Sequence, residues 1–222
     1  MRKTVKFLAL AAVSGMAISS VPAFAEQGDI IVRVRAINVM PSEESGSILP
    51  AFPGEQVSVD NSPAPEVDIT YMATDNIGFE LIAATTKHSA SGVSGTTGGI
   101  GRLASTWVLP PTLTAQYHFA PDAAIRPYIG AGINYTMFYN ENASDALEAA
   151  VGETDVSLKS SFGYALQAGF DIPINDRFTF NVDVKYLDVD TTATLRTTAA
   201  GTQRVKINLD PIVVGVGLGI KL

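Results

Sequence analysis

The 222-residue sequence is 46% apolar and 17% charged and contains no cysteine, a composition typical of one folded domain and not of a disordered chain or a disulfide-rich scaffold. Its formal net charge of −7 provides no attraction for nucleic acid or for an anionic lipid surface. Nucleic acid is therefore excluded as a partner.

The first 25 residues form a segment of their own. Arg2, Lys3 and Lys6 supply a basic start, an apolar run covers 7–18, and small residues at 23–25 resemble a cleavage site. The run is too short to cross ~30 Å of hydrocarbon as a helix. We interpret 1–25 as a signal peptide cleaved near Ala25, with 26–222 as the mature domain; the alternative is a buried N-terminal helix.

The mature chain alternates between apolar and polar residues with the period of two that is typical of β-strands. In the first such segment Ile30, Val32 and Val34 alternate with Arg33 and Arg35. No uncharged apolar stretch long enough for a spanning helix follows residue 25. Eight segments are predicted as strands: 30–35, 66–71, 79–83, 106–119, 128–137, 161–171, 178–186 and 212–221.

The connections between these segments alternate in length. Short links fall at 74–77, 120–125 and 173–177, and long links at 41–65, 87–104, 140–157 and 190–203. With an even number of strands, all short links lie at one end, as in outer-membrane barrels with periplasmic turns and extracellular loops. The sequence therefore predicts an all-β fold, an eight-stranded antiparallel transmembrane β-barrel.

The two faces of the strands indicate which side meets lipid. A soluble lipocalin-like barrel is the alternative, and it would be apolar inside and polar outside. Here the more uniformly apolar face carries aromatic side chains that do not fit the interior of a small barrel, whereas the other face carries the charges. We predict lipid outside, with interfacial girdle residues at Trp107, Tyr117, Phe119, Phe170, Phe178 and Tyr186.

The inward-facing residues differ along the barrel axis. Charges that can pair across a narrow interior predict a polar plug in the periplasmic half, formed by Arg33, Arg35, Glu80, Asp171, Asp183, Lys185 and Lys221. Apolar residues predict a pocket in the extracellular half, lined by Ile37, Val39, Ile82, Val108, Phe138, Leu187, Val189, Val205, Ile207 and Leu209. The last three face inward only if the strand keeps its register through Pro211; a bulge there would turn them toward lipid.

Pro110 and Pro111 lie inside the fourth predicted strand. Each proline removes a backbone N–H that a closed barrel would use. We predict a lateral opening in the wall at these two residues; the alternative is a bulge or strand end just above the membrane.

Two of the long loops have distinct patterns. Ser144, 145–151 and Gly152 predict a capped two-turn helix in the third loop. The first loop, 41–65, contains five prolines and is predicted to be irregular and exposed.

Other motifs are weak. The glycines of 215–219 are better explained by a crowded lumen than by a dinucleotide loop. His88 and His118 are predicted at opposite ends, and Asp188 and Asp190 at a solvated rim. We therefore predict no catalytic residues, no metal and no cofactor.

Several runs resemble the outer membrane protein W family: YMATDNIG at 71–78, LPPTL at 109–113, RPYIGAGINYT at 126–136, SLK at 157–159, DVDTTA at 188–193 and LDP at 209–211. They span nearly the whole mature chain. The resemblance implies a barrel in the Gram-negative outer membrane with an apolar lumen, linked to uptake of small hydrophobic molecules and opening sideways. The chain departs from the family in ending in Lys221 and Leu222 instead of an aromatic residue, and in having Lys185 where an aromatic residue closing the lumen is expected.

The favoured hypothesis is a non-enzymatic channel for passive uptake of small hydrophobic molecules. The alternative is a structural or receptor barrel that acts through its extracellular loops, for phages or toxins or in envelope stress. A third hypothesis, an acyl-modifying enzyme, has His88 as its sole candidate. The expected partners are outer-membrane lipid and lipopolysaccharide, small hydrophobic ligands and the barrel insertion machinery.

Overall fold

The computed structural model describes residues 26–42 and 44–222, so the predicted signal peptide, 1–25, lies outside the described residues. Its helices are α1 (Gly95–Ile100) and α2 (Asp145–Val151). Its strands are β1 (Ile30–Met40), β2 (Glu44–Ser45), β3 (Val57–Val59), β4 (Ser62–Met72), β5 (Ile77–Ala84), β6 (Thr86–Gly92), β7 (Arg102–Leu109), β8 (Thr112–His118), β9 (Arg126–Ala143), β10 (Thr154–Leu158), β11 (Ser161–Pro173), β12 (Phe178–Leu187), β13 (Asp190–Thr197), β14 (Gly201–Asn208) and β15 (Ile212–Lys221).

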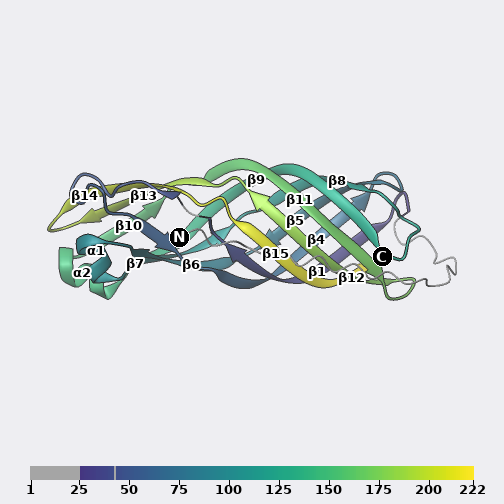
Figure 1. Cartoon of the computed structure of the whole chain (residues 1–222), viewed down its shortest axis with the longest axis horizontal. Coiled ribbons are helices and arrows are strands. Elements are labelled where there is room, and N and C mark those ends of the chain that lie inside the picture. Colours follow the sequence, from purple (N-terminus) through teal and green to yellow (C-terminus); the bar gives the residue numbers. More distant parts are fainter. Residues whose placement is uncertain (1–25, 43) are drawn as a thin grey trace, which may run out of the picture.

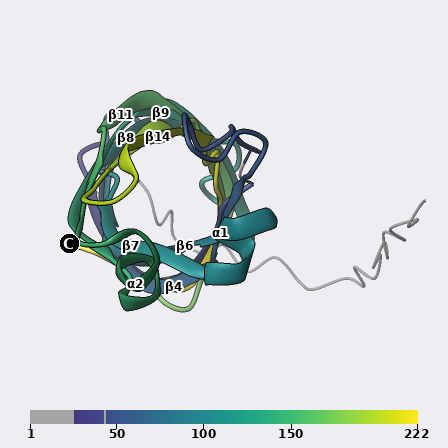
Figure 2. The same ribbon diagram turned by 90° about the vertical axis from the view of Figure 1, so that its left-hand side faces the viewer.

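Eight of these strands close into one antiparallel ring (Figures 1 and 2). Neighbours follow the order β1, β4, β5, β8, β9, β11, β12 and β15, and β15 pairs with β1 from Ile31↔Lys221 to Met40↔Ile212. A closed ring leaves no unpaired edge, which is the requirement for β-structure inside hydrocarbon. The predicted eight-stranded barrel is confirmed.

Side chains alternate between the two faces of the ring. In β1, Val34 is exposed whereas Arg33 and Arg35 are buried. Each strand of the ring exposes large apolar side chains, for example Val34, Ile69, Phe79, Tyr117, Ile133, Tyr164, Phe180 and Val216. The charges therefore point inward and the apolar face points outward, as predicted. No helix within residues 26–42 and 44–222 is long and apolar enough to cross a membrane.

The long connections continue the wall as folded structure, which we call the extension (Figure 1). β7 pairs with β6 and with the end of β9, β3 pairs with β6, and β10, β13, β14 and β2 form a four-stranded sheet. The prediction of an irregular, exposed first loop is wrong in part, because Ile48 and Val57 are buried and Pro63 and Pro65 belong to β4. The apolar residues of this loop pack against other connections, and a pattern within one loop does not reveal such contacts.

Both short helices are anchored by side-chain hydrogen bonds at their first turn. As predicted, Ser144 Oγ accepts a hydrogen bond from the N–H of Leu147 in α2 at 3.1 Å. At α1, the Glu55 carboxylate accepts three bonds, from the Thr97 hydroxyl at 2.6 Å and from the N–H groups of Thr97 and Thr96 at 2.8 and 2.9 Å. These bonds favour the charged carboxylate and therefore hold the pKa of Glu55 below its usual value.

The interior of the ring toward the short turns is filled by charged and polar side chains, the plug. Arg35 donates to Glu80 Oε1 at 2.6 Å, to Glu66 Oε1 at 2.8 Å and to Asn181 Oδ1 at 2.8 Å, and its guanidinium lies 2.8 Å from Asp68 Oδ2. All of these residues are buried. Arg35 therefore connects β1 with β4, β5 and β12 through the middle of the barrel.

Two further cations complete the plug. Arg33 pairs with Asp171 Oδ2 at 2.9 Å, and Lys185 Nζ pairs with Asp183 Oδ1 at 2.6 Å. Six of the seven predicted plug residues thus lie in the network, which also includes Glu66, Asp68, Gln116, Tyr128, Gln167 and Asn181. The prediction is wrong for Lys221. This residue pairs with Asp29 at 3.3 Å and is partly exposed, because its register opposite Ile31 places it at the rim.

Replacing Arg35 with Met should strongly destabilise the barrel. The substitution leaves buried carboxylates without their main counter-charge, which costs ~3–5 kcal/mol. Thermal unfolding in detergent micelles measures the loss. Arg196→Met is the matched control, because Arg196 pairs with Asp155 at 2.9 Å on the exposed surface, where such pairs are worth up to ~1 kcal/mol. Equal losses in the two variants would contradict the importance of the plug.

The bonds of Glu55 predict that α1 loosens in acid. Because the folded-state pKa is depressed, the stabilisation is present above the unfolded-state pKa of roughly 4.3 and is lost as the pH falls through the folded-state pKa. Amide hydrogen exchange at Thr96 and Thr97, measured relative to Leu147, should therefore accelerate in that range. Glu55→Gln should exchange rapidly even at neutral pH and show no acid step. If the ratio of the exchange rates of Thr96 and Thr97 to that of Leu147 does not change with pH in the wild type, the role of the Glu55 carboxylate is refuted.

Candidate functional site: an apolar cavity beside a gap in the barrel wall

A cavity of about 140 Å³ lies between the plug and the extension. All ten residues predicted for the upper lumen line it: Ile37, Val39, Ile82, Val108, Phe138, Leu187, Val189, Val205, Ile207 and Leu209. The size is comparable to that of apolar protein cavities that bind a benzene-sized molecule. The cavity thus has the size and the surface to hold a small apolar solute.

The floor of the cavity is the top of the plug. Glu66 and Lys185 both line the cavity and form an ion pair at 2.8 Å. Lys185, which replaces the aromatic residue expected from the family resemblance, therefore closes the lumen through an ion pair. Below this level the buried plug occupies the ring, so the cavity is a pocket and not a straight bore.

β14 ends at Asn208 and β15 begins at Ile212 in another sheet, yet the alternation of inward-facing residues continues through Pro211. Asp210 has a positive φ of 34°, and the chain bends there while Leu209, Pro211 and Val213 all line the cavity. Val205 and Ile207 are buried. The alternative of a bulge that turns Val205, Ile207 and Leu209 toward lipid is therefore wrong.

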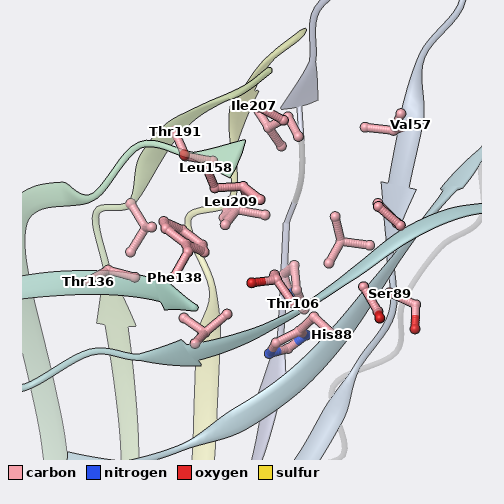
Figure 3. A pocket seen from close by; sticks show the side chains of 18 of the residues that line it. Val57, His88, Ser89, Thr106, Thr136, Phe138, Leu158, Thr191, Ile207 and Leu209 are labelled. Atoms are coloured by element: carbon pink, nitrogen blue, oxygen red, sulfur yellow. The ribbon is translucent and has the colours of Figure 1, made fainter. Parts of the chain in front are cut away.

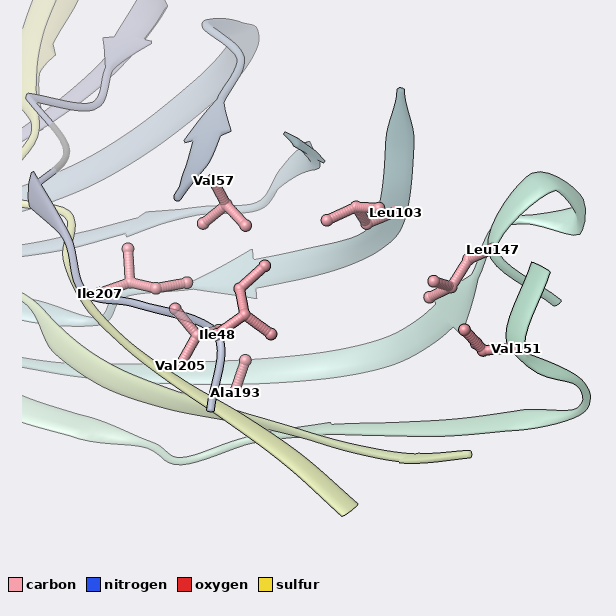
Figure 4. Close-up of a cluster of buried hydrophobic side chains, with 8 residues drawn as sticks. All are labelled: Ile48, Val57, Leu103, Leu147, Val151, Ala193, Val205 and Ile207. Atoms are coloured by element: carbon pink, nitrogen blue, oxygen red, sulfur yellow. The ribbon is translucent and has the colours of Figure 1, made fainter. Parts of the chain in front are cut away.

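The cavity continues into the extension through a cluster of apolar side chains (Figure 4), of which the sequence had assigned only Val205 and Ile207. The cluster consists of Ile48, Val57, Leu103, Leu147, Val151, Ala193, Val205 and Ile207. Its members come from all four long connections, so the extension encloses an apolar entrance. The one signal available in the sequence was the i, i+4 spacing of Leu147 and Val151, which places both on one face of α2.

One side of the cavity carries polar side chains from β6 and β7 (Figure 3). His88 Nδ1 lies 2.8 Å from the carbonyl oxygen of Asp60, so this nitrogen carries the proton and donates. His88 Nε2, 3.0 Å from Thr86 Oγ1, then accepts the threonine proton. Burial in the extension lowers the pKa of His88, which favours the neutral ring that this pattern requires.

The ladder between the third and fourth strands of the ring is interrupted beside the cavity. β5 and β8 pair as far as Ile82↔Thr112, β6 and β7 pair from Thr86↔Val108, and no pair joins 83–85 to 109–111. We call this interruption the gap. The two ladders have the same register on either side of the gap, so no residue is inserted there and the gap is not a bulge. β7 ends at Leu109 and β8 begins at Thr112, so the two prolines lie between strand ends, as the alternative expected. Ala84 and Pro110 lie at the gap and also line the cavity.

The two prolines face different neighbours. The Pro111 carbonyl accepts a hydrogen bond from the N–H of Tyr135 at 3.0 Å, so Pro111 faces β9. The backbone of a strand alternates in direction, so Pro110 faces Ala84 across the gap. Pro110 has no N–H to donate, and its carbonyl accepts from Thr112 Oγ1 at 2.9 Å. Pro110 is therefore the residue that breaks the ladder.

The strand opposite Pro110 also lacks pairs on its other side. β4 and β5 pair as far as Glu66↔Ala84, and β3 and β6 pair from Val59↔Ala90. Pro63 and Pro65 lie in the intervening part of β4. On the outer surface the hydroxyls of Thr85 and Tyr139 are 2.5 Å apart. Thr85 is thus held by this side-chain bond where ladder pairs are missing on both sides.

The remaining sequence motifs form no second site. His118 packs against Tyr128 at the plug, with 5.2 Å between the ring centroids, far from His88 in the extension. Within the described part of the chain, no group of three or more His, Cys, Asp or Glu side chains is placed to hold a metal ion. A Cβ at Gly217 would come within 2.1 Å of the Val34 carbonyl oxygen, so this glycine is required by close packing beside Arg35.

Comparisons with known proteins agree with this architecture. Outer membrane protein W of Escherichia coli (strain K12) is 41% identical over 93% of this chain and 94% of its own. Outer membrane protein W of Vibrio cholerae serotype O1 is 36% identical over the whole of both chains. The crystal structure of the outer membrane protein OprG from Pseudomonas aeruginosa matches with a TM-score of 0.83 and 32% identity, over 89% of this chain and 97% of that one.

The family assignment follows from the extent of the match. The model of the OmpW family matches residues 26–222, which is the whole predicted mature domain. The relatives are outer-membrane proteins, and the apolar outer face of the closed ring suits the same location. The chain is therefore an outer-membrane β-barrel that belongs to the OmpW family.

Proposed function

We propose that this barrel is a passive channel for small hydrophobic molecules, which enter through the extension, rest in the cavity and leave through the gap into the membrane. One observation carries the proposal: the aliphatic cavity and the interrupted ladder meet, since Ala84 and Pro110 belong to both. The expected partners are accordingly small apolar solutes and the surrounding lipid.

The plug supports a lateral route over an axial one. An axial route would lead an apolar solute through buried ion pairs, such as the contact of Arg35 with Glu80 at 2.6 Å. Separating such pairs leaves buried charges uncompensated, and an apolar solute offers them no new partner. The gap instead leads from the aliphatic cavity toward an outer face with exposed residues such as Leu81 and Leu113.

The free energy of an apolar solute in the cavity is better suited to passage into the membrane than to tight binding. An apolar solute gains about 25 cal/mol for each Å² that it removes from water, and it gains this on entering either the cavity or the hydrocarbon. Transfer from cavity to membrane is then close to neutral in free energy. No energy source or catalytic residue is required.

The extension bears on the two alternatives. A receptor barrel would present its recognition residues outward, but the apolar residues of the long connections turn inward and join the cavity lining. For an acyl-modifying enzyme, His88 would have to serve as a base. Its two ring nitrogens are already engaged by Asp60 and Thr86.

Ile82→Asp should abolish uptake of apolar solutes. Ile82 is buried and lines the cavity, so a carboxylate there brings water and charge into the binding space. The measurement is the rate at which Gram-negative cells without related barrels of their own consume toluene through a cytoplasmic toluene-oxidising enzyme, at equal surface levels of barrel. Leu81→Asn, on the outer face, is the neighbouring control. Undiminished consumption in Ile82→Asp would overturn the proposal.

Pro110→Val should close the lateral exit, whereas Pro111→Val should not. The first restores an N–H toward Ala84 across the gap, and each added ladder bond is worth roughly 1 kcal/mol. The second restores a donor toward β9, where the Pro111 carbonyl already accepts from the Tyr135 N–H and ladder pairs resume at Thr112↔Asn134. In the same assay toluene consumption should fall in Pro110→Val and in the double variant, and stay near wild type in Pro111→Val. If the two single variants behave alike, the exit is not at the gap.

A further inference from the structure

Three threonines surround Pro110 at the inner mouth of the gap. Thr86 pairs with Val108, two residues before Pro110. Thr112 lies two residues after Pro110, where pairing with β9 resumes. β7 and β8 pair with β9 in the same register on either side of Pro110, from Leu109↔Met137 to Thr112↔Asn134. This register places Thr136 opposite Pro110. All three are buried and line the cavity. We call Thr86, Thr112 and Thr136 the collar.

Each hydroxyl proton of the collar is committed to an acceptor of the protein. Thr112 donates to the Pro110 carbonyl at 2.9 Å. Thr136 donates to Asn134 Oδ1 at 3.0 Å, and this oxygen is the acceptor because Asn134 Nδ2 donates to the Tyr164 carbonyl. Thr86 donates to His88 Nε2, as derived above. The collar therefore offers a solute the remaining lone pairs of its oxygens.

Because its hydroxyl protons are already donated, the collar favours solutes that donate a hydrogen bond over solutes that only accept one. A solute O–H or N–H can bond to a threonine oxygen without disturbing the existing bonds. A solute that only accepts would have to draw a proton away, which leaves the Pro110 carbonyl, Asn134 Oδ1 or His88 Nε2 buried and unsatisfied.

Anions are disfavoured at the same place. The cation nearest to the cavity, Lys185, already pairs with Glu66 and Asp183. The plug beneath it holds five buried carboxylates, Glu66, Asp68, Glu80, Asp171 and Asp183, around Arg33, Arg35 and Lys185. At the collar a carboxylate solute would lose its hydration and meet threonine hydroxyls whose protons are already donated, without an excess of positive charge.

We propose that the collar makes the channel prefer apolar molecules that carry one neutral hydrogen-bond donor, such as phenols and alcohols, over the corresponding hydrocarbons, ethers and carboxylates. This inference rests on the proposed function, because it assigns a substrate class to the same cavity. A single added hydrogen bond at a buried site corresponds to about a fivefold preference.

The test compares four probes of one shape: toluene, p-cresol, 4-methylanisole and 4-methylbenzoate. The full mature chain is placed in phosphatidylcholine nanodiscs, and retention of each probe at neutral pH is measured as the excess over empty nanodiscs. We expect p-cresol to be retained about fivefold better than toluene, and 4-methylanisole and 4-methylbenzoate no better than toluene.

Variants assign the effect to the collar. Thr86→Val, Thr112→Val and Thr136→Val combined should reduce the retention of p-cresol to that of toluene while toluene is still retained, which also shows that the barrel is folded. Thr86→Ser, Thr112→Ser and Thr136→Ser combined should keep the preference. Thr191→Val is the matched control, because Thr191 lines the cavity but donates to the Lys159 carbonyl away from the gap.

The outcomes separate this inference from the proposed function. If wild-type barrel retains neither toluene nor p-cresol above empty nanodiscs, the proposed function fails and the inference fails with it. If toluene is retained but p-cresol is not preferred, or the preference survives in the triple Val variant, the channel stands and the collar is overturned. Retention of 4-methylanisole or 4-methylbenzoate equal to that of p-cresol also overturns it.

Discussion

The ion pairs of Arg35 hold the interior of the barrel together, and the location of the cavity depends on them. An eight-stranded ring has an interior just wide enough for side chains, so whatever fills one level closes the barrel at that level. Arg35 reaches Glu66, Glu80 and Asp183 from a single position on β1. Since the half toward the short turns is filled in this way, the cavity lies toward the extension, and the plug separates it from the short turns.

The gap illustrates how a barrel wall is interrupted at low cost. Inside a membrane every unpaired backbone group is expensive, because hydrocarbon offers no hydrogen bonds. Pro110 removes its own donor, and the Thr112 hydroxyl satisfies its carbonyl. An ordinary residue at this position would leave both groups to be paired, and the simplest partner is the neighbouring strand. The sequence Pro110-Pro111-Thr112 therefore opens the ladder without leaving the carbonyl of Pro110 unsatisfied.

Much of this architecture could be predicted from the sequence because lipid imposes a simple rule on it. Alternation assigns each side chain to one face, so Arg33, Ile37 and Ile82 were placed inside correctly. Val205 also faces inward, because Pro211 does not shift the alternation. Depth is less certain than face, which is why Lys221 was assigned to the plug although it lies at the rim. The packing of the extension could not be predicted, because Ile48, Leu103 and Leu147 come from different long connections and belong to one cluster only in the folded structure.

Stability is distributed unevenly around the ring, and this bears on the proposed lateral exit. Around the plug, ladder pairs are reinforced by buried ion pairs, whereas near the gap Ala84 lacks a pair with Pro110 and Thr85 lacks ladder pairs on both sides. Local opening occurs where few bonds must break. Pro63 and Pro65 on one side and Pro110 on the other remove donors that would tie this strand to its neighbours. Widening the ring beside the cavity would therefore break fewer ladder bonds than widening it at the plug.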